Sequence, residues 1–165
     1  MQTINKKCDK CGKIKKAGHV DIIDDKCICK ECLYGNIKPF QIYPIGVVGN
    51  GRQRSRKNFG TAGKEGASRI ELIESQKPFL YKLDDEKYIT VIYYLHETNS
   101  VRSVFKRGLD GKEVGVFASR TPYRLSRIAI QDVRLVKIEG VTLYVEGLDA
   151  VNGTPVLDIK MCWHA

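Results

Sequence analysis

Five of the chain's six cysteines lie within its first 32 residues, and four of them form two C-x2-C pairs. Cys8 and Cys11 make the first pair, and Cys29 and Cys32 make the second after a gap of seventeen residues. This gap falls within the range of about 15 to 20 residues that is typical of a four-thiolate zinc site. Four cysteine sulfurs complete the tetrahedral coordination of Zn²⁺ and leave no position for water, so the pattern predicts a structural zinc site.

Two nearby residues leave the ligand set open. Cys27 could replace Cys29 as a ligand, and His19 lies between the pairs, where we expect a surface residue. Disulfides are the less favoured interpretation, because the N-terminus lacks the apolar stretch of a secretory signal and the reducing cytoplasm disfavours them. We therefore expect a cytoplasmic protein in which segment 1–37 folds around zinc, since metal binding supplies folding free energy that so short a segment lacks.

The remaining residues, 38–165, predict one small all-β domain, a sandwich or barrel. Short stretches rich in Val, Ile and Tyr alternate with Gly, Pro or Asn, and no long amphipathic helix is present. The predicted strands are FQIYPIGVV (40–48), RIELIE (69–74), YITVIYYL (88–95), VGVFAS (114–119), VRLVKIEG (133–140) and VTLYVEG (141–147). The longest apolar run has eight residues, far fewer than the roughly 20 of a membrane-spanning helix, so no membrane segment is expected.

Turn and phase signals refine this prediction. The residues around Gly140 suggest a tight hairpin, and Asn152 with Gly153 is the strongest two-residue turn signal in the chain. Ile128 and Ile130 are out of phase with the apolar residues that follow them, which predicts a β-bulge near Gln131.

The chain is basic, with a formal net charge of +9, and the cations are clustered. One cluster is the segment RQRSRK at 52–57, and the other lies between residues 120 and 137. Such patches attract phosphate backbones through counterion release, so the charge favours nucleic acid as a partner. The residues expected to contact RNA are Arg54, Arg56, Lys57, Arg124 and Arg127.

Familiar catalytic motifs are absent from the sequence. It contains no phosphate-binding P-loop, dinucleotide-binding glycine turn or H-E-x-x-H helix, and its three histidines are scattered. Two polar segments follow apolar stretches instead, GVFASRTPYR (115–124) and EGLDAVNGTPVLDIK (146–160). They suggest a polar pocket at strand ends, although Asp and Asn in such turns often only satisfy local backbone groups.

These two segments, together with YPIGVV, GRQ and VIYYLHE, resemble the signature segments of the TsaA-like (TrmO-type) β-barrel tRNA methyltransferase family. The resemblance spans about residues 40–162 and leaves the cysteine pairs outside. It implies a barrel that binds S-adenosylmethionine near a homodimer interface. It also implies N6-methylation of threonylcarbamoyl-adenosine next to the anticodon of tRNA, or of a related base.

The same resemblance implies a set of site residues. Those expected to bind the cofactor are Arg52, Gln53, His96, Glu97, Arg120, Ile130, Ala150, Val151, Asn152 and Gly153. Methyl transfer chiefly requires alignment of the reacting atoms, so no nucleophilic side chain is needed. The acceptor nitrogen must lose a proton, and Asp149, Asp158 or His96, in this order, could accept it.

Three positions depart from the family pattern. The usual R-P-N-P-I-G is RLSRIA at 124–129, the usual D-G-T-P is NGTP at 152–155, and the usual histidine-glutamine pair is His96 with Glu97. The lost prolines would have made the loop rigid. The sequence therefore predicts a methyltransferase with an altered loop, and the alternative is a zinc-containing RNA-binding module that has lost catalysis.

Overall fold

The computed structural model describes residues 4–51, 67–98 and 100–163, and the chain divides into two compact units. We call Met1–Gln41 with Thr98–Ser126 the cysteine unit, and Ile42–Glu97 with Arg127–Ala165 the barrel unit. The prediction assigned residues 98–126 to the barrel domain, whereas in the structure they group with the cysteine-bearing segment. No helix in the described ranges has the length and apolar character needed to cross a membrane.

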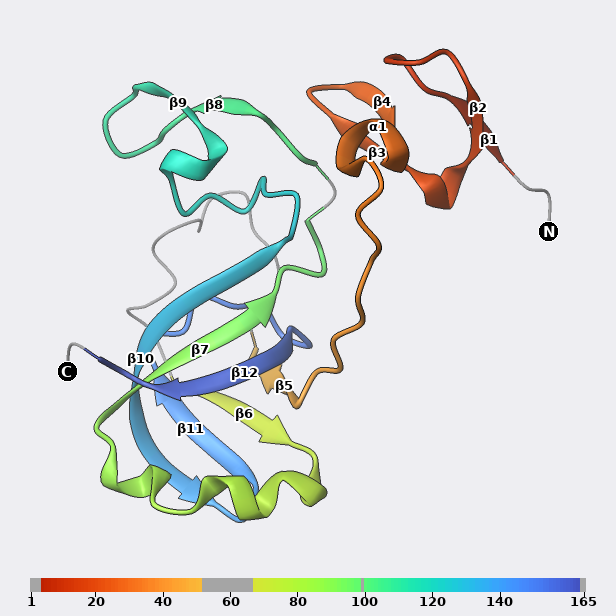
Figure 1. Ribbon diagram of the computed structural model, residues 1–165. Coiled ribbons are helices and arrows are strands. Elements are labelled where there is room, and N and C mark those ends of the chain that lie inside the picture. The colour runs from red at the N-terminus through yellow and green to blue at the C-terminus, as the bar shows by residue number, and fades with distance from the viewer. Residues whose placement is uncertain (1–3, 52–66, 99, 164–165) are drawn as a thin grey trace. The chain divides into compact units, whose positions relative to one another are not determined.

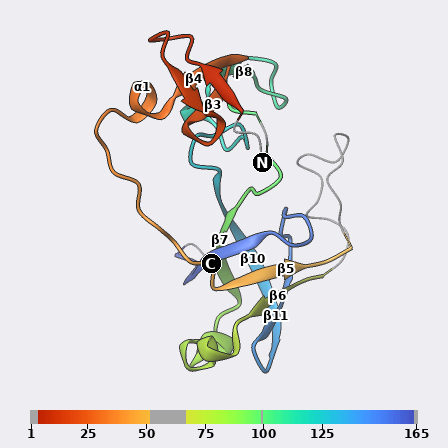
Figure 2. The same cartoon turned by 90° about the vertical axis from the view of Figure 1, so that its right-hand side faces the viewer.

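The barrel unit is built around a closed barrel of six antiparallel strands, in the order β10-β11-β6-β5-β12-β7 (Figures 1 and 2). The strands are β5 (Gly46–Gly49), β6 (Ser68–Leu72), β7 (Tyr88–Tyr94), β10 (Ile128–Glu139), β11 (Thr142–Glu146) and β12 (Pro155–Met161). Short 3₁₀ helices at Glu74–Leu80 and Leu83–Asp85 connect β6 to β7. The all-β prediction is confirmed, and β12 is a strand that the prediction had treated as part of a turn.

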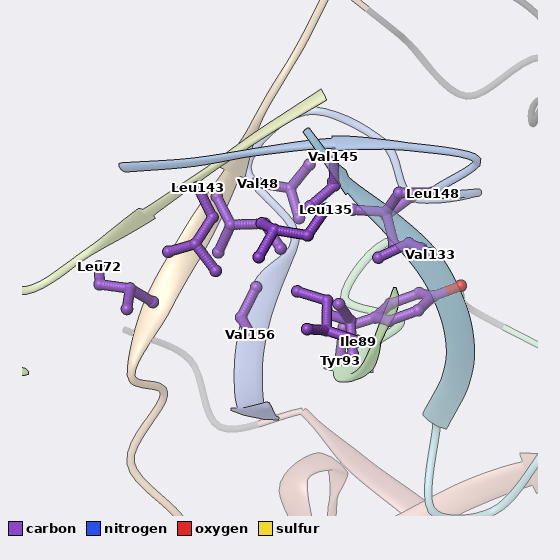
Figure 3. Close-up of a cluster of buried hydrophobic side chains, with 13 residues drawn as sticks. Val48, Leu72, Ile89, Tyr93, Val133, Leu135, Leu143, Val145, Leu148 and Val156 are labelled. Atoms are coloured by element: carbon purple, nitrogen blue, oxygen red, sulfur yellow. The ribbon is translucent and has the colours of Figure 1, made fainter. Parts of the chain in front are cut away.

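Alternation along β7 shows why this sequence forms a barrel. Ile89, Val91 and Tyr93 are buried, and the residues between them are only half-buried, as expected when side chains alternate between the two faces of a sheet. Figure 3 shows the buried cluster inside the barrel, with residues from all six strands. Its fully buried members are Val48, Ile70, Ile89, Val91, Val133, Leu143, Val145, Leu148 and Val156.

Strand β10 corrects the predicted bulge. Residues 128–134 pair with β7 in an unbroken register, so no bulge lies at Gln131. The register shift lies between Leu135 and Lys137, where β10 pairs with β11. Ile128 and Ile130 are out of phase because they point out of the barrel and are exposed, whereas Gln131 occupies an inward position.

Two turns match their predictions. Strands β10 and β11 form a hairpin through Gly140, which has φ 62°. Asn152 and Gly153 form a turn before β12, and Gly153 has φ 77°, a conformation that glycine adopts without steric cost.

The described residues of the cysteine unit form three short antiparallel hairpins and one α-helix of five residues (Figure 1). Its elements are β1 (Asn5–Lys7), β2 (Ile14–Lys16), a 3₁₀ turn (Ala17–His19), β3 (Val20–Ile23), β4 (Lys26–Cys29), α1 (Lys30–Tyr34), β8 (Val104–Lys106), β9 (Glu113–Gly115) and a 3₁₀ turn (Val116–Ala118). The predicted strand at 114–119 is thus only partly a strand.

Candidate functional site

The structure brings the sulfurs of Cys8, Cys11, Cys29 and Cys32 together, all within 4.8 Å of one another. The Cys11 and Cys29 sulfurs are 3.8 Å apart. Sulfurs bound to zinc at about 2.3 Å in a tetrahedron are separated by about 3.8 Å, so this spacing fits a thiolate-bound metal ion. The donor set, four soft sulfurs in a closed arrangement, suits Zn²⁺.

Two local structures produce this convergence. Cys8 and Cys11 lie in the loop between β1 and β2, which is closed by the Gly12 N–H donating to the Cys8 carbonyl at 2.8 Å. Cys29 is the residue just before α1, and Cys32 lies in the first turn of that helix. Side chains three residues apart on a helical turn point to the same side, so Cys29 and Cys32 present their sulfurs together. The closed loop between β1 and β2 does the same for Cys8 and Cys11.

The backbone prepares Cys8 for metal binding. The Cys29 N–H donates to the Cys8 sulfur at 3.2 Å, and Cys8 is fully buried. This N–H lowers the pKa of the Cys8 thiol to about 6, whereas the pKa values of the neighbouring Cys29 and Cys32 thiols are raised. A thiolate is the form that binds zinc.

Neither of the two ambiguous residues belongs to the sulfur cluster of the described chain. Cys27 pairs with Ile22 in the β3–β4 hairpin, and its N–H donates to the carboxylate of Asp9 at 2.6 Å. His19 ends a 3₁₀ turn and is exposed.

In the barrel unit, the predicted cofactor loop follows β11 and is held by side chains from other strands. Gln131 donates to the Gly147 carbonyl at 2.5 Å and accepts the Asp149 N–H at 2.8 Å. The Tyr93 hydroxyl donates to the Asp149 carbonyl at 3.1 Å. These bonds fix the backbone at Asp149, which the sequence nominated as proton acceptor.

The second half of the loop is fixed by Asn50. Its amide nitrogen donates to the Ala150 carbonyl at 3.0 Å and to the Ser68 hydroxyl at 3.1 Å, and its backbone N–H donates to the side chain of Asn152 at 2.9 Å. The Gly153 N–H donates to the Val48 carbonyl at 2.7 Å. The loop therefore keeps Ala150 buried, Val151 half-buried, and both Asn152 and Gly153 exposed.

Tyr93 is a buried hydrogen-bond donor with an unusual pKa. Burial, and secondarily the charge of Asp149, raises the pKa of Tyr93 to about 12. Its ring packs among the core side chains, with the hydroxyl at the edge of that cluster (Figure 3). The hydroxyl is therefore protonated at any physiological pH.

His96 and Glu97 lie just after β7. The His96 Nε2 atom is 3.8 Å from a Glu97 carboxylate oxygen. The His96 Nδ1 atom is buried and has no hydrogen-bond partner among the described residues. A buried ring nitrogen in this state is a free position for a ligand's polar atom or a water molecule.

Ile130 and Asp158 are neighbours through β7, because both pair with Ile92, from β10 and β12 respectively. Ile130 is exposed and Asp158 is half-buried on this outer face. The Asp158 carboxylate forms an ion pair with Lys160 at 2.6 Å and accepts the Ile159 N–H at 2.9 Å. These two bonds occupy a carboxylate that the sequence offered as an acceptor of the proton.

The arginines predicted to bind the cofactor or RNA differ in their surroundings. Arg124 donates to the Ser119 carbonyl at 2.5 Å and to the Val116 carbonyl at 3.3 Å, and its guanidinium lies over the Phe117 ring. Arg120, in the same loop of the cysteine unit, is exposed. The predicted residues Arg52, Gln53, Arg54, Arg56 and Lys57 lie outside the described part of the chain.

Arg127 shows a consequence of the altered RLSRIA segment. It has φ 53°, and its carbonyl accepts the Leu95 N–H at 2.8 Å. The resemblance described above implies proline at this position, and a proline ring fixes φ near −65°. The backbone here therefore has a conformation that the family's proline cannot adopt.

Sequence reasoning missed the residues that hold the loop, namely Tyr93, Gln131 and Asn50. Gln131 could have been found as the one polar residue in the inward phase shared with Val133 and Leu135. Asn50 carries no distinctive local signal, because its partners in the loop are about 100 residues away in the sequence.

Comparison with known proteins supports the resemblance. A sequence model of the tRNA-methyltransferase O N-terminal domain matches residues 56–164. A probable S-adenosyl-L-methionine-binding protein from Archaeoglobus fulgidus is 33% identical over 125 residues, which are 73% of this chain and 33% of the relative. A tRNA (adenine(37)-N6)-methyltransferase from Mus musculus is 32% identical over 95 residues, 56% of this chain and 22% of the enzyme.

Among solved structures, the crystal structure of TrmO from P. aeruginosa matches with a TM-score of 0.60 at 25% sequence identity. The match covers 77% of this chain and 56% of that one. The chain therefore spans only about a third or less of the two curated relatives named above, and the cysteine pairs precede the residues that the family model matches.

Proposed function

Because the chain belongs to the family of the tRNA-methyltransferase O N-terminal domain, we propose that it is an S-adenosylmethionine-dependent methyltransferase that acts on tRNA. The observation that carries this proposal is the family match over residues 56–164, which includes the loop fixed by Gln131 and Asn50. The proposed acceptor is N6 of threonylcarbamoyl-adenosine next to the anticodon, or a related base. The match to a tRNA (adenine(37)-N6)-methyltransferase supports this class of acceptor.

Three groups of the barrel unit fit the cofactor's chemistry. Asn152 offers an exposed side-chain amide beside the exposed Gly153, Ile130 offers an exposed apolar surface for the base, and the His96 Nδ1 atom offers a polar position without a partner among the described residues. A site that combines apolar walls with a few fixed polar groups is the usual form of a small-molecule site. We propose that Ala150 and Val151 supply the backbone of this site, and that Glu97 and Arg120 also bind the cofactor.

When bound, S-adenosylmethionine supplies a methyl group, which leaves the sulfonium sulfur as its bond to N6 of adenosine forms. The acceptor nitrogen gives up one proton, and we propose that the Asp149 carboxylate accepts it. Asp149 is the first choice because Gln131 and Tyr93 fix its backbone on both sides. Asp158 is the second choice as proton acceptor, because its carboxylate forms an ion pair with Lys160, and His96 is the third.

The charge distribution supports RNA as the macromolecular partner. The cysteine unit has fifteen of the 28 Lys and Arg residues and seven of the 19 Asp and Glu residues, which leaves +8, whereas the barrel unit has +1. Zinc bound to four thiolates would lower the first value to about +6. We propose that this unit attracts the tRNA backbone, together with Arg127 and the 52–57 segment. Arg124 contributes less than the sequence suggested, because one of its nitrogens is bound to backbone carbonyls.

We also propose that the cysteine cluster holds zinc and that the protein is a homodimer. The spacing of the sulfurs and their closed set of four support the metal. The exposed isoleucines of β10 support a second copy, because apolar side chains on the outer face of a barrel gain free energy when a partner covers them.

The decisive experiment is transfer of a labelled methyl group to bulk tRNA, followed by nucleoside analysis. Asp149→Asn should lower kcat by about 10²- to 10⁴-fold, the usual contribution of a positioned proton acceptor, while cofactor affinity changes little. Asp132→Asn is the matched control, because Asp132 is an exposed acid on β10 that accepts a bond from Thr90. No methyl transfer by the parent protein, together with no heat on titration with millimolar S-adenosylmethionine, would refute the proposal.

The second candidate function is a zinc-containing RNA-binding module without catalysis. The backbone of Arg127 favours it, because this conformation replaces the proline-containing loop of the family. Salt-sensitive tRNA binding in the absence of cofactor binding would support this candidate. Replacing one phosphate-binding cation by an uncharged residue should reduce the slope of log affinity against log salt by about 0.7 to 0.9.

A further inference from the structure

The cysteine unit joins two segments that are about 60 residues apart in the sequence, and the junction is a two-residue turn. Asp24 and Asp25 connect β3 to β4, with φ 48° and 63°. Positive φ at both central positions is typical of a type I′ hairpin turn, for which Asn-Gly is the favoured sequence. Two aspartates in this turn therefore suggest a role beyond reversing the chain.

Asp24 connects the turn to the second segment of the unit, residues 98–126, through hydrogen bonds. Its carboxylate accepts the Ser103 backbone N–H at 3.0 Å and the Ser103 hydroxyl at 2.5 Å. Its own N–H donates to the carbonyl of Val101, which is buried, and Ile23 forms a parallel β-bridge with Val101. The bonds from Ser103 hold the pKa of Asp24 below its usual value, so the carboxylate stays charged at neutral pH.

Hydrogen bonds continue from this junction to the arginine loop. The Ser103 carbonyl accepts the Val116 N–H at 2.9 Å, and the Val116 carbonyl accepts a bond from Arg124. The Arg102 N–H donates to the Tyr123 carbonyl at 3.1 Å, and its guanidinium lies over the Tyr123 ring. Both routes end on the loop of residues 116–124, which contains Arg120.

On its other side, the junction connects to the sulfur cluster. Strand β4 leads from the Asp24–Asp25 turn to Cys29, and Cys27 in that strand exchanges two hydrogen bonds with Asp9, beside Cys8. A change in the cluster that displaces β4 therefore moves the Asp24 turn as well.

We propose that Asp24 is a positioning residue, through which the metal-bound cysteine cluster holds the 116–124 loop in place. Only the functional consequence of this inference rests on the proposed function, in which Arg120 binds the cofactor and Arg124 contacts RNA. Metal occupancy then controls the order of a loop that lies far from the cysteines in the sequence. Loss of the metal would release the loop before the barrel strands open.

The test measures hydrogen exchange in the full chain with zinc added. Asp24→Gly removes the carboxylate and keeps a residue that favours positive φ, so the turn itself should remain. We expect exchange at the amides of Arg102, Ser103 and Val116 to rise about tenfold, while amides in β7 and β10 change less than about twofold. Asp25→Gly is the matched control, since it alters the same turn without touching Ser103, and should have no effect on these amides.

Two further measurements distinguish coupling between the metal site and the 116–124 loop from a general loss of structure caused by the substitution. Chelation of the metal should raise exchange at the same three amides in the parent chain, and should add little in Asp24→Gly, because the connection is already broken. Asp24→Asn keeps an acceptor for the Ser103 N–H and should restore part of the protection. If Asp24→Gly fails to fold, Ser103→Ala removes the hydroxyl and should show a smaller increase at the same sites.

Equal exchange in the Asp24→Gly and Asp25→Gly chains would overturn the inference, as would chelation that leaves the three amides unchanged. Hydrogen exchange depends on neither tRNA nor methyl transfer. A chain that shows the exchange response but transfers no methyl group would refute the proposed function alone. In an active protein, Asp24→Gly should raise the KM for tRNA about tenfold or lower kcat, and Asp24→Asn should partly reverse that change.

Discussion

Gln131 holds the backbone of Asp149: its side-chain oxygen accepts the Asp149 N–H at 2.8 Å, and its nitrogen donates to Gly147 two residues earlier. A single amide thus satisfies a donor and an acceptor in the loop after β11. The orientation of this loop depends on a residue of β10, and the two meet inside the same barrel unit.

Gln131→Leu should therefore loosen the loop. The substitution roughly keeps the side-chain volume and leaves the Asp149 N–H and the Gly147 carbonyl without their partner, at a cost of about 1 to 3 kcal/mol in unfolding free energy. We expect cofactor affinity to fall by about tenfold, measured by calorimetric titration. Gln131→Glu keeps the acceptor but loses the donor and should be intermediate; affinity unchanged in both variants would argue against this role.

Tyr93 should make the protein's stability sensitive to alkaline pH. Its pKa is raised to about 12 in the folded chain from 10.0. A raised pKa means that this contribution to stability is complete below pH 10 and is lost as the pH rises toward 12. Thermal unfolding should show this loss, and Tyr93→Phe should lose about 1 kcal/mol at neutral pH. In the Tyr93→Phe chain the difference in stability between about pH 9 and about pH 12 should be smaller, because the titrating hydroxyl is gone.

Gly46 should be intolerant of any side chain. A Cβ atom at this position would lie 2.4 Å from the Glu71 carbonyl oxygen, so β5 and β6 would have to separate. Gly46→Ala should lower the free energy of unfolding by about 1 to 3 kcal/mol, measured by denaturant titration. Gly51→Ala is the control, because a Cβ there meets no atom within 4 Å. Similar stability losses in the two variants would contradict this explanation.

Ile130→Glu should dissociate a homodimer that uses the outer face of β10. Ile130 is 52% exposed and lies beside Ile92, so burial against a second copy would remove apolar surface from water. Sedimentation velocity should show a dimer for the parent chain and a monomer for Ile130→Glu. Val136→Glu, with 44% exposure on the same strand, tests whether any exposed apolar residue gives this result.

The sequence predicted those parts of the molecule that local rules determine. The C-x2-C spacing predicted the cysteine cluster, because each pair closes within one turn, and the short stretches rich in Val, Ile and Tyr predicted five of the six barrel strands, all except β12. Both strong turn signals, at Gly140 and Gly153, coincide with positive φ. The break in apolar periodicity after Ile130 predicted a bulge near Gln131. The structure instead shows continuous pairing, with two exposed isoleucines and an inward-facing Gln131.

Long-range contacts could not be predicted from one sequence. Nothing near Asp24 indicates that Ser103 is its partner, since both residues occupy ordinary polar segments. The same holds for Asn50 and Ala150, which are joined across 100 residues. These two contacts determine which segments share a unit and how the candidate loop is held, so the predicted site contained the loop but not its supports.

The closed strand order has a further consequence for how the protein meets its partners. Each of the six strands has a neighbour on both sides, so no described strand of the barrel is unpaired along the whole of one edge. The pairing between β12 and β5 is short, with only Pro155 and Val156 in register with β5. A strand that adds to the barrel therefore finds unpaired backbone only in short stretches, and side chains and loops form most of the surface that a partner meets.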